Sequence, residues 1–195
     1  MTRSANISRT TRETKVSLSL TLDGSGAGGR ETGVAFFDHL LDQVARHGRV
    51  DLEVQASGDL ETGAHHTVED TGLALGQALD EALGDRAGIY RYGQATVPMD
   101  EARATAVIDV SGRPYTDFDA RLPSRSIGDF DADLAEEFFR AFANAAGLTL
   151  HLRVEVGTNA HHMVEAAFKA FALALRRAVA IDPTETGVPS TKGLL

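Results

Sequence analysis

One cluster of residue types that bind metals occurs twice in the sequence. The segments GAHHTVEDTGLALGQAL (63–79) and NAHHMVEAAFKAFALAL (159–175) each carry it, as His65, His66 and Glu69 in the first and as His161, His162 and Glu165 in the second. Helical residues four apart share a face, so the first histidine and the glutamate can bind one ion, while the second histidine points about 100° away. Imidazole and carboxylate ligands without sulfur suit Mn²⁺, Fe²⁺ or Zn²⁺. One such motif alone is equally typical of a polar first turn of a helix, but two copies favour a protein with two metal sites.

Three further histidines stand in different surroundings. His39, in FFDHLLDQ, lies off the apolar face of its predicted helix and is free to project from it. His47 precedes the glycine that ends this helix, where a partly charged imidazole interacts favourably with the helix dipole. His151 lies on the polar side of a predicted strand, a position typical of a sheet surface. The pattern alone leaves His39 open as a ligand or a solvated residue.

Basic residues beside glycines are candidates for binding an anion. Arg91 in GIYRYG and Arg113 in SGRPY stand at expected bends, where a guanidinium can close on a phosphate. Lys169 follows the second cluster by one helical turn, and Lys192 stands near Ser190 in the PSTKG tail. Taken singly, each of them is also explained as a surface charge.

The elements that must position these residues follow one order twice. Alternating apolar residues predict strands at 16–22, 50–54, 104–110 and 148–156. Helical spacing predicts helices at 36–48 and 134–147, each closed by a glycine, and two more that begin at the histidine clusters. This order predicts an α+β domain made by internal duplication, with the helices gathered on one face of two sheets. We expect half-repeats at 1–94 and 95–182 and an extended tail at 183–195.

The composition is that of a globular protein without disulfides. The chain has 195 residues, 43% of them hydrophobic and 24% charged, and it has no cysteine, which excludes disulfides and thiolate metal sites. A net charge of −9 and the lack of a dense Lys/Arg block argue against a nucleic-acid partner. No apolar run is long enough for a membrane span, and no secretory signal is visible, so we expect no membrane partner and a cytoplasmic location.

Several motifs in one order carry a family resemblance. FFDHLLDQ, HHTVEDTGLALGQAL, PMDEA, SGRPY, HHMVEAAFKAFALAL and PSTKG together resemble the imidazoleglycerol-phosphate dehydratase family, from about Arg12 to the C-terminus. The resemblance implies loss of water from imidazole glycerol phosphate to give imidazole acetol phosphate, a step of histidine biosynthesis. It also implies two Mn²⁺ ions per chain, duplicated halves like domain 2 of ribosomal protein S5, and a 24-subunit homo-oligomer whose sites are shared between subunits.

The resemblance also implies roles for individual residues. The implied metal ligands are His39, His65, His66, Glu69, Glu137, His161, His162 and Glu165. Glu137 stands where many members have a histidine, and a carboxylate can also bind Mn²⁺. The implied substrate contacts are Glu13, Arg91, Arg113, Lys169, Ser190 and Lys192. Glu13 and Glu165 are the implied proton carriers, with Asp100 as a third candidate.

The implied reaction gives the duplication a chemical reason. The proton to be lost, on the carbon that bears the C2 hydroxyl, has no adjacent carbonyl to acidify it. An imidazolate held by both nitrogens between two metals can push electrons through the ring and expel the C3 hydroxyl. The resulting diazafulvene-like intermediate can then lose the C2 proton. Two ligand sets must face each other across the ring, and an internal repeat provides two sets.

Two other functions fit the predicted metal ligands. A dinuclear metallohydrolase would attack an ester or amide with a bridging hydroxide, and a non-catalytic protein would buffer or sense the metal. The hydrolase predicts turnover of generic phosphoesters. The non-catalytic protein leaves Arg91, Arg113 and the PSTKG tail without a use, so an assay with imidazole glycerol phosphate separates the three.

Overall fold

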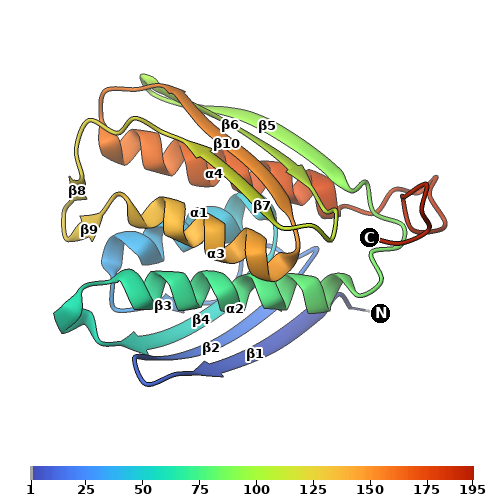
Figure 1. Cartoon of the computed structure of the whole chain (residues 1–195), viewed down its shortest axis with the longest axis horizontal. Helices are drawn as coiled ribbons and strands as arrows, with labels where there is room; N and C mark the ends of the chain where they lie inside the picture. Colours follow the sequence, from blue (N-terminus) through green and yellow to red (C-terminus); the bar gives the residue numbers. More distant parts are fainter. Residues whose placement is uncertain (1) are drawn as a thin grey trace.

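The computed structural model describes residues 2–195 and places four helices between two four-stranded sheets (Figure 1). The elements are β1 (Ser4–Thr10), β2 (Thr14–Thr21), β3 (Arg30–Glu31), α1 (Ala35–Gly48), β4 (Asp51–Gly58), a 3₁₀ turn (Leu60–Thr62), α2 (His65–Leu83), β5 (Tyr92–Met99), β6 (Ala102–Asp109), β7 (Tyr115–Asp119), β8 (Ser126–Ile127), β9 (Phe130–Asp131), α3 (Leu134–Ala146), β10 (Thr149–Val156) and α4 (Ala160–Val179). Helix α2 packs on the first sheet and α4 on the second, while α1 contacts α4 and α3 contacts α2. The predicted α+β fold is confirmed.

The two sheets share one topology. Their strand orders are β1-β2-β4-β3 and β5-β6-β10-β7. In each sheet the first three strands are antiparallel, and the last runs parallel to its neighbour. Within β2, alternation sends Val16, Leu18 and Leu20 into the core and leaves the residues between them exposed. The common topology agrees with the repeat expected from the sequence.

Six strands were not predicted: β1, β5 and β7, and the two-residue strands β3, β8 and β9. β1, β5 and β7 are edge strands whose inward positions include small or polar residues, such as Ala5, Gly93 and Thr116, so the apolar alternation is weak. β5 also contains Pro98, which is tolerated at a sheet edge because an edge strand has unpaired N–H positions. Because β5 begins at Tyr92, the second sheet starts before the expected boundary between residues 94 and 95.

The predicted helix ends at glycines agree with the structure. α3 is closed by Gly147, which has a φ of 65° and donates its N–H to the carbonyl of Ala143. α1 ends at Gly48, but the left-handed residue that closes it is Arg49, with a φ of 55°. Within the described residues, no helix is long and apolar enough to cross a membrane.

A close helix contact and an aromatic core hold the halves together. A Cβ on Gly76 of α2 would lie 2.4 Å from the carbonyl oxygen of Phe142 in α3, so only glycine allows this approach. Buried phenylalanines then connect α3 to α4, with the rings of Phe139 and Phe168 4.6 Å apart. This packing places the N-terminal ends of α2 and α4, where the histidine clusters lie, at the same end of the molecule (Figure 1).

Candidate metal centre and substrate site

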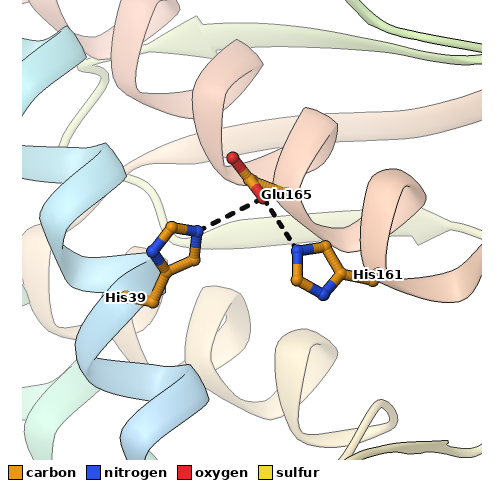
Figure 2. Close-up of side chains that lie close together, drawn as sticks. All are labelled: His39, His161 and Glu165. Carbon is orange, nitrogen blue, oxygen red and sulfur yellow. Dashed lines mark hydrogen bonds and ion pairs between the residues drawn. The ribbon is translucent and has the colours of Figure 1, made fainter.

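Helices α1 and α4 bring three predicted metal ligands together (Figure 2). Oε2 of Glu165 lies 3.3 Å from Nε2 of His39 and 3.1 Å from Nε2 of His161. In residues 2–195, this donor group is the one set of three or more His, Asp or Glu side chains whose ligating atoms all lie within 4.8 Å of one another. His39 therefore belongs with the second cluster, which the sequence places more than half the chain away.

The Glu165 carboxylate is buried and ionised. Burial by itself raises its pKa, but hydrogen bonds from Lys169 and His39 and the charge of Lys169 outweigh burial and hold the pKa below its usual value. The Lys169 Nζ lies 2.8 Å from Oε1, on the side away from the imidazoles, so Oε2 is free for them. The Asn159 side chain accepts the His161 N–H and fixes the first turn of α4. The group therefore presents negative charge to an ion.

The second histidine of each cluster makes a different contact. His66 Nδ1 lies 3.1 Å from both carboxylate oxygens of Asp59, and His162 Nδ1 lies 2.8 Å from Oε2 of Glu101. The hydrogen bond to the carboxylate is the main cause that raises the pKa of each histidine, and the His162 bond is the main cause that lowers the pKa of Glu101 to about 2. Sequence reasoning missed both carboxylates: Glu101 stands in the PMDEA motif, whereas nothing distinguishes Asp59 in the sequence.

Two predicted proton carriers face these rings from their other side. Glu13 Oε1 lies 3.9 Å from Nε2 of His66, and Asp100 Oδ2 lies 3.8 Å from Nε2 of His162. Both residues come from the hairpin turns that open the two sheets, β1–β2 and β5–β6. The structure thus places Glu13 and Asp100 at corresponding points, beyond hydrogen-bonding distance but close to the rings.

Three predicted ligands belong neither to the donor group nor to the two histidine–carboxylate contacts. His65 and Glu69 are about half exposed, and Nε2 of His65 lies 3.9 Å from Oε2 of Glu69. Glu137, on α3, lies 3.0 Å from the Arg140 guanidinium. Together with His66 and His162, these donors do not converge with the first group on one point in the part of the chain that is described.

A cleft of about 910 Å³ adjoins the donor group. One side carries His39, His161 and Glu165, and the rest is largely apolar, with Val34, Phe36, Leu60, Ile127 and Phe130 among its lining residues. The Phe36 and His161 rings are 4.8 Å apart between centroids. A wall of this kind accommodates a flat heteroaromatic ring and limits access of water.

The basic residues form a second group, made of Arg91, Arg113 and the tail at 188–192. Arg91 Nε lies 2.7 Å from Oδ1 of Asp109, and its Nη1 donates to the Pro189 carbonyl at 2.9 Å. Arg113 Nη2 lies 3.8 Å from the same carboxylate, and most of its side chain is exposed. The Lys192 N–H donates to Oγ of Ser190. The predicted phosphate contacts other than Lys169 and Glu13 therefore share one neighbourhood.

The donor group and the basic group lie at opposite ends of α4. The Arg91 N–H donates to the carbonyl of Ala178 near the end of the helix, while His161 is in its first turn. At 1.5 Å per residue, the two ends are about 25 Å apart. One small phosphorylated molecule cannot contact both groups of the same chain. The two ligand sets likewise do not converge on one point among residues 2–195.

Comparisons with known proteins agree on one family. The family model described as imidazoleglycerol-phosphate dehydratase matches residues 32–175. The chain is 61% identical over 193 residues to an imidazoleglycerol-phosphate dehydratase of Symbiobacterium thermophilum, with 99% of this chain and 93% of the relative covered. It is 55% identical to that of Moorella thermoacetica, with 100% of each chain covered.

Two solved structures of imidazoleglycerol-phosphate dehydratases have the same fold as this chain. The imidazoleglycerol-phosphate dehydratase of Staphylococcus aureus superposes with a TM-score of 0.84 at 39% identity, covering 92% of this chain and 99% of that one. The Pyrococcus furiosus protein, solved in complex with (S)-C348, superposes with a TM-score of 0.85 at 35% identity, covering 97% and 100%. The likeness thus extends over nearly the whole chain.

Proposed function

The chain belongs to the imidazoleglycerol-phosphate dehydratase family, and we propose that it works with two Mn²⁺ ions bound by its histidines and carboxylates. It is a hydro-lyase of histidine biosynthesis, which removes water from imidazole glycerol phosphate to give imidazole acetol phosphate. The observation that carries the metal proposal is the convergence of His39, His161 and Glu165 on one point.

The donor group suits a Mn²⁺-class ion in its chemistry. Its ligating atoms are two imidazole nitrogens and an oxygen of an ionised carboxylate, a mixture that such ions accept and that disfavours Cu(I). The remaining proposed ligands are His65, His66, Glu69, Glu137 and His162. Bound ions supply positive charge that favours the imidazolate form of the substrate ring.

The side chains then have distinct tasks. The apolar wall with Phe36 and Phe130 holds the imidazole ring beside the donor group and limits water. Glu13, which faces His66 from the β1–β2 turn, moves the proton of the C2 carbon, with Glu165 as the second carboxylate of the reaction. Arg91, Arg113, Ser190 and Lys192 bind the phosphate, because guanidinium and ammonium groups form charge-assisted hydrogen bonds to its oxygens. Lys169 forms an ion pair with Glu165, which holds this carboxylate in place beside the imidazole ring of the substrate.

A complete site requires more than one copy of the chain. The separation of about 25 Å along α4 means that the donor group of one chain must meet the basic group of another. We propose that this sharing occurs in a 24-subunit assembly, and that the enzyme acts in the cytoplasm. The assembly then places the basic group of one chain, which binds the phosphate, within reach of the donor group of another chain, which binds the imidazole ring.

A turnover assay tests the proposal. Purified protein is freed of metal with a chelator, reloaded with Mn²⁺, and incubated with imidazole glycerol phosphate or with a generic phosphoester. We expect imidazole acetol phosphate to form only in the reloaded sample, and the phosphoester to persist. A protein that consumes the phosphoester and spares the imidazole substrate contradicts the proposal, and His161→Ala serves as the inactive control.

A further inference from the structure

We propose that Asp59 and Glu101 are positioning residues that hold the rings of His66 and His162 with Nε2 free to bind metal. Each carboxylate accepts a hydrogen bond from Nδ1, at 3.1 Å for Asp59 and 2.8 Å for Glu101. The inference rests on the proposed function, because it assigns a task to the surroundings of two proposed ligands.

The two contacts are alike although the backbone around them is not. The internal repeat makes His66 and His162 equivalent, but their partners come from different elements. Asp59 directly follows β4, the strand before α2, whereas Glu101 stands in the turn between β5 and β6. The corresponding turn of the first half carries Glu13, which lies near Nε2 of His66 at 3.9 Å and not near Nδ1. The repeated backbone alone therefore does not explain why both rings meet a carboxylate at Nδ1.

Each carboxylate is itself held in place. Oε1 of Glu101 accepts the N–H groups of Thr158 and Asn159, at 3.1 and 2.8 Å, which leaves Oε2 for His162. Oδ2 of Asp59 accepts the hydroxyl of Thr62 at 3.1 Å. These bonds fix where the acceptor oxygens point, and therefore fix the orientation of the two rings.

The chemistry of imidazole decides what such an acceptor does. A neutral ring carries one proton, and an acceptor at Nδ1 holds it there, so the lone pair remains on Nε2. Metal-binding histidines commonly give their other N–H to a carboxylate, which sets the tautomer and the ring orientation. Nε2 of His162 lies 3.8 Å from its nearest carboxylate, that of Asp100, so no hydrogen bond occupies it.

Glu101→Gln tests the proposal sharply, because the backbone constrains the new side chain. Glutamine has one carbonyl oxygen, and the N–H groups of Thr158 and Asn159 both require an acceptor at that place. The amide NH₂ must then face Nδ1 of His162 and donate to it, which moves the ring proton to Nε2. The variant thus keeps the shape of the site while it blocks the proposed ligating atom.

Two readouts follow the change. Solid-state NMR of the metal-free protein, labelled with ¹⁵N-histidine and kept at alkaline pH, reports the tautomer, and the spectrum of His162→Ala identifies the signal. We expect Nδ1–H in the parent and Nε2–H in Glu101→Gln. Competition with a chelator reports Mn²⁺ affinity, which we expect to fall about 10- to 100-fold at one of the sites.

A matched control separates positioning from general stability. Asp117 lies 3.3 Å from Nδ1 of His151 on the outer face of the second sheet, and neither residue is a proposed ligand or substrate contact. Asp117→Asn removes a similar contact, and we expect its Mn²⁺ affinity to equal that of the parent. Thermal unfolding of both variants shows whether either change disturbs the fold. Asp59→Ala, which removes the acceptor at Nδ1 of His66, tests the first half.

The outcomes distinguish this inference from the proposed function. If Glu101→Gln keeps the parent's tautomer, or switches it without a change in Mn²⁺ affinity, the positioning role is overturned. Turnover by the parent shows that the proposed function still holds in that case. Absence of turnover and of Mn²⁺ binding in the parent overturns the proposed function. In that case the metal-free spectrum still decides whether Glu101 sets the tautomer of His162.

Discussion

Two impaired variants should restore activity when they assemble together, because each one damages a group at a different end of α4. His161→Ala removes a member of the donor group, and Arg113→Ala removes a member of the basic group. Arg113 is a suitable choice because its side chain is mostly exposed, so its loss perturbs the fold little. Loss of its charge-assisted bonds to phosphate should cost about 1.5–3 kcal/mol, roughly a 10- to 150-fold lower kcat/KM.

The recovered activity follows from the separation of the two groups. In a mixed particle with equal amounts of both chains, a shared site draws its donor group and its basic group independently. About one quarter of the sites then receive both groups intact, and the activity should approach one quarter of the parent's in a random symmetric assembly. A site contained in one chain gives no intact sites at all, because every chain carries one of the two changes.

Co-expression with two affinity tags isolates the mixed particles for the assay. The matched control combines His161→Ala with His39→Ala, which damage the same donor group. Since neither chain then carries an intact group, we expect no recovery in that pair. If the His161→Ala and Arg113→Ala mixture has only the summed activity of the separate variants, the reasoning from the length of α4 is wrong.

Further expectations concern metal content, packing and assembly. Metal analysis should approach two Mn²⁺-class ions per chain, and Glu137→Gln should lower it, whereas Glu136→Gln, which alters the other partner of Arg140, should not. Gly76→Ala should lower the free energy of unfolding by about 1–3 kcal/mol in a denaturant titration, since its Cβ meets the α3 backbone, while Gly29→Ala should be nearly neutral. Chelation should convert the large particle into a smaller species in sedimentation velocity. The reason is that ligands from two chains at one ion, as the family resemblance implies, make metal binding part of association; an unchanged size without metal contradicts this.

The sequence predicted the elements best where a periodic apolar pattern is long. Helices at 36–48 and 134–147 and the two helices that open at the histidine clusters all occur within a residue or two of their expected places. The edge strands β1, β5 and β7 escaped prediction because small or polar residues at their inward positions weaken the apolar alternation. The local apolar pattern therefore predicts long buried helices and strands, whereas edge strands form because they pair with a neighbouring strand.

The site was predictable in its residue types but not in its grouping. Helical spacing correctly pairs His161 with Glu165, which lie 3.1 Å apart. The partnership of both with His39 depends on how α1 packs on α4, and no local pattern contains that information. Glu101 was missed for the same reason, since its contact with His162 joins residues 61 positions apart. The roles implied for the remaining ligands and substrate contacts stay predictions.

The geometry of α4 also constrains what kind of assembly can serve the reaction. Each chain offers a donor group at one end of this helix and a basic group at the other, so a contact that completes a site joins two different surfaces. Such contacts close when a two-fold axis pairs each donor group with the other chain's basic group, or when head-to-tail contacts complete a ring; otherwise they continue as an open filament. An open arrangement leaves one unmatched donor group and one unmatched basic group at its ends. Only a closed assembly gives every chain a complete site, so a closed particle, and not an open filament, fits this chain.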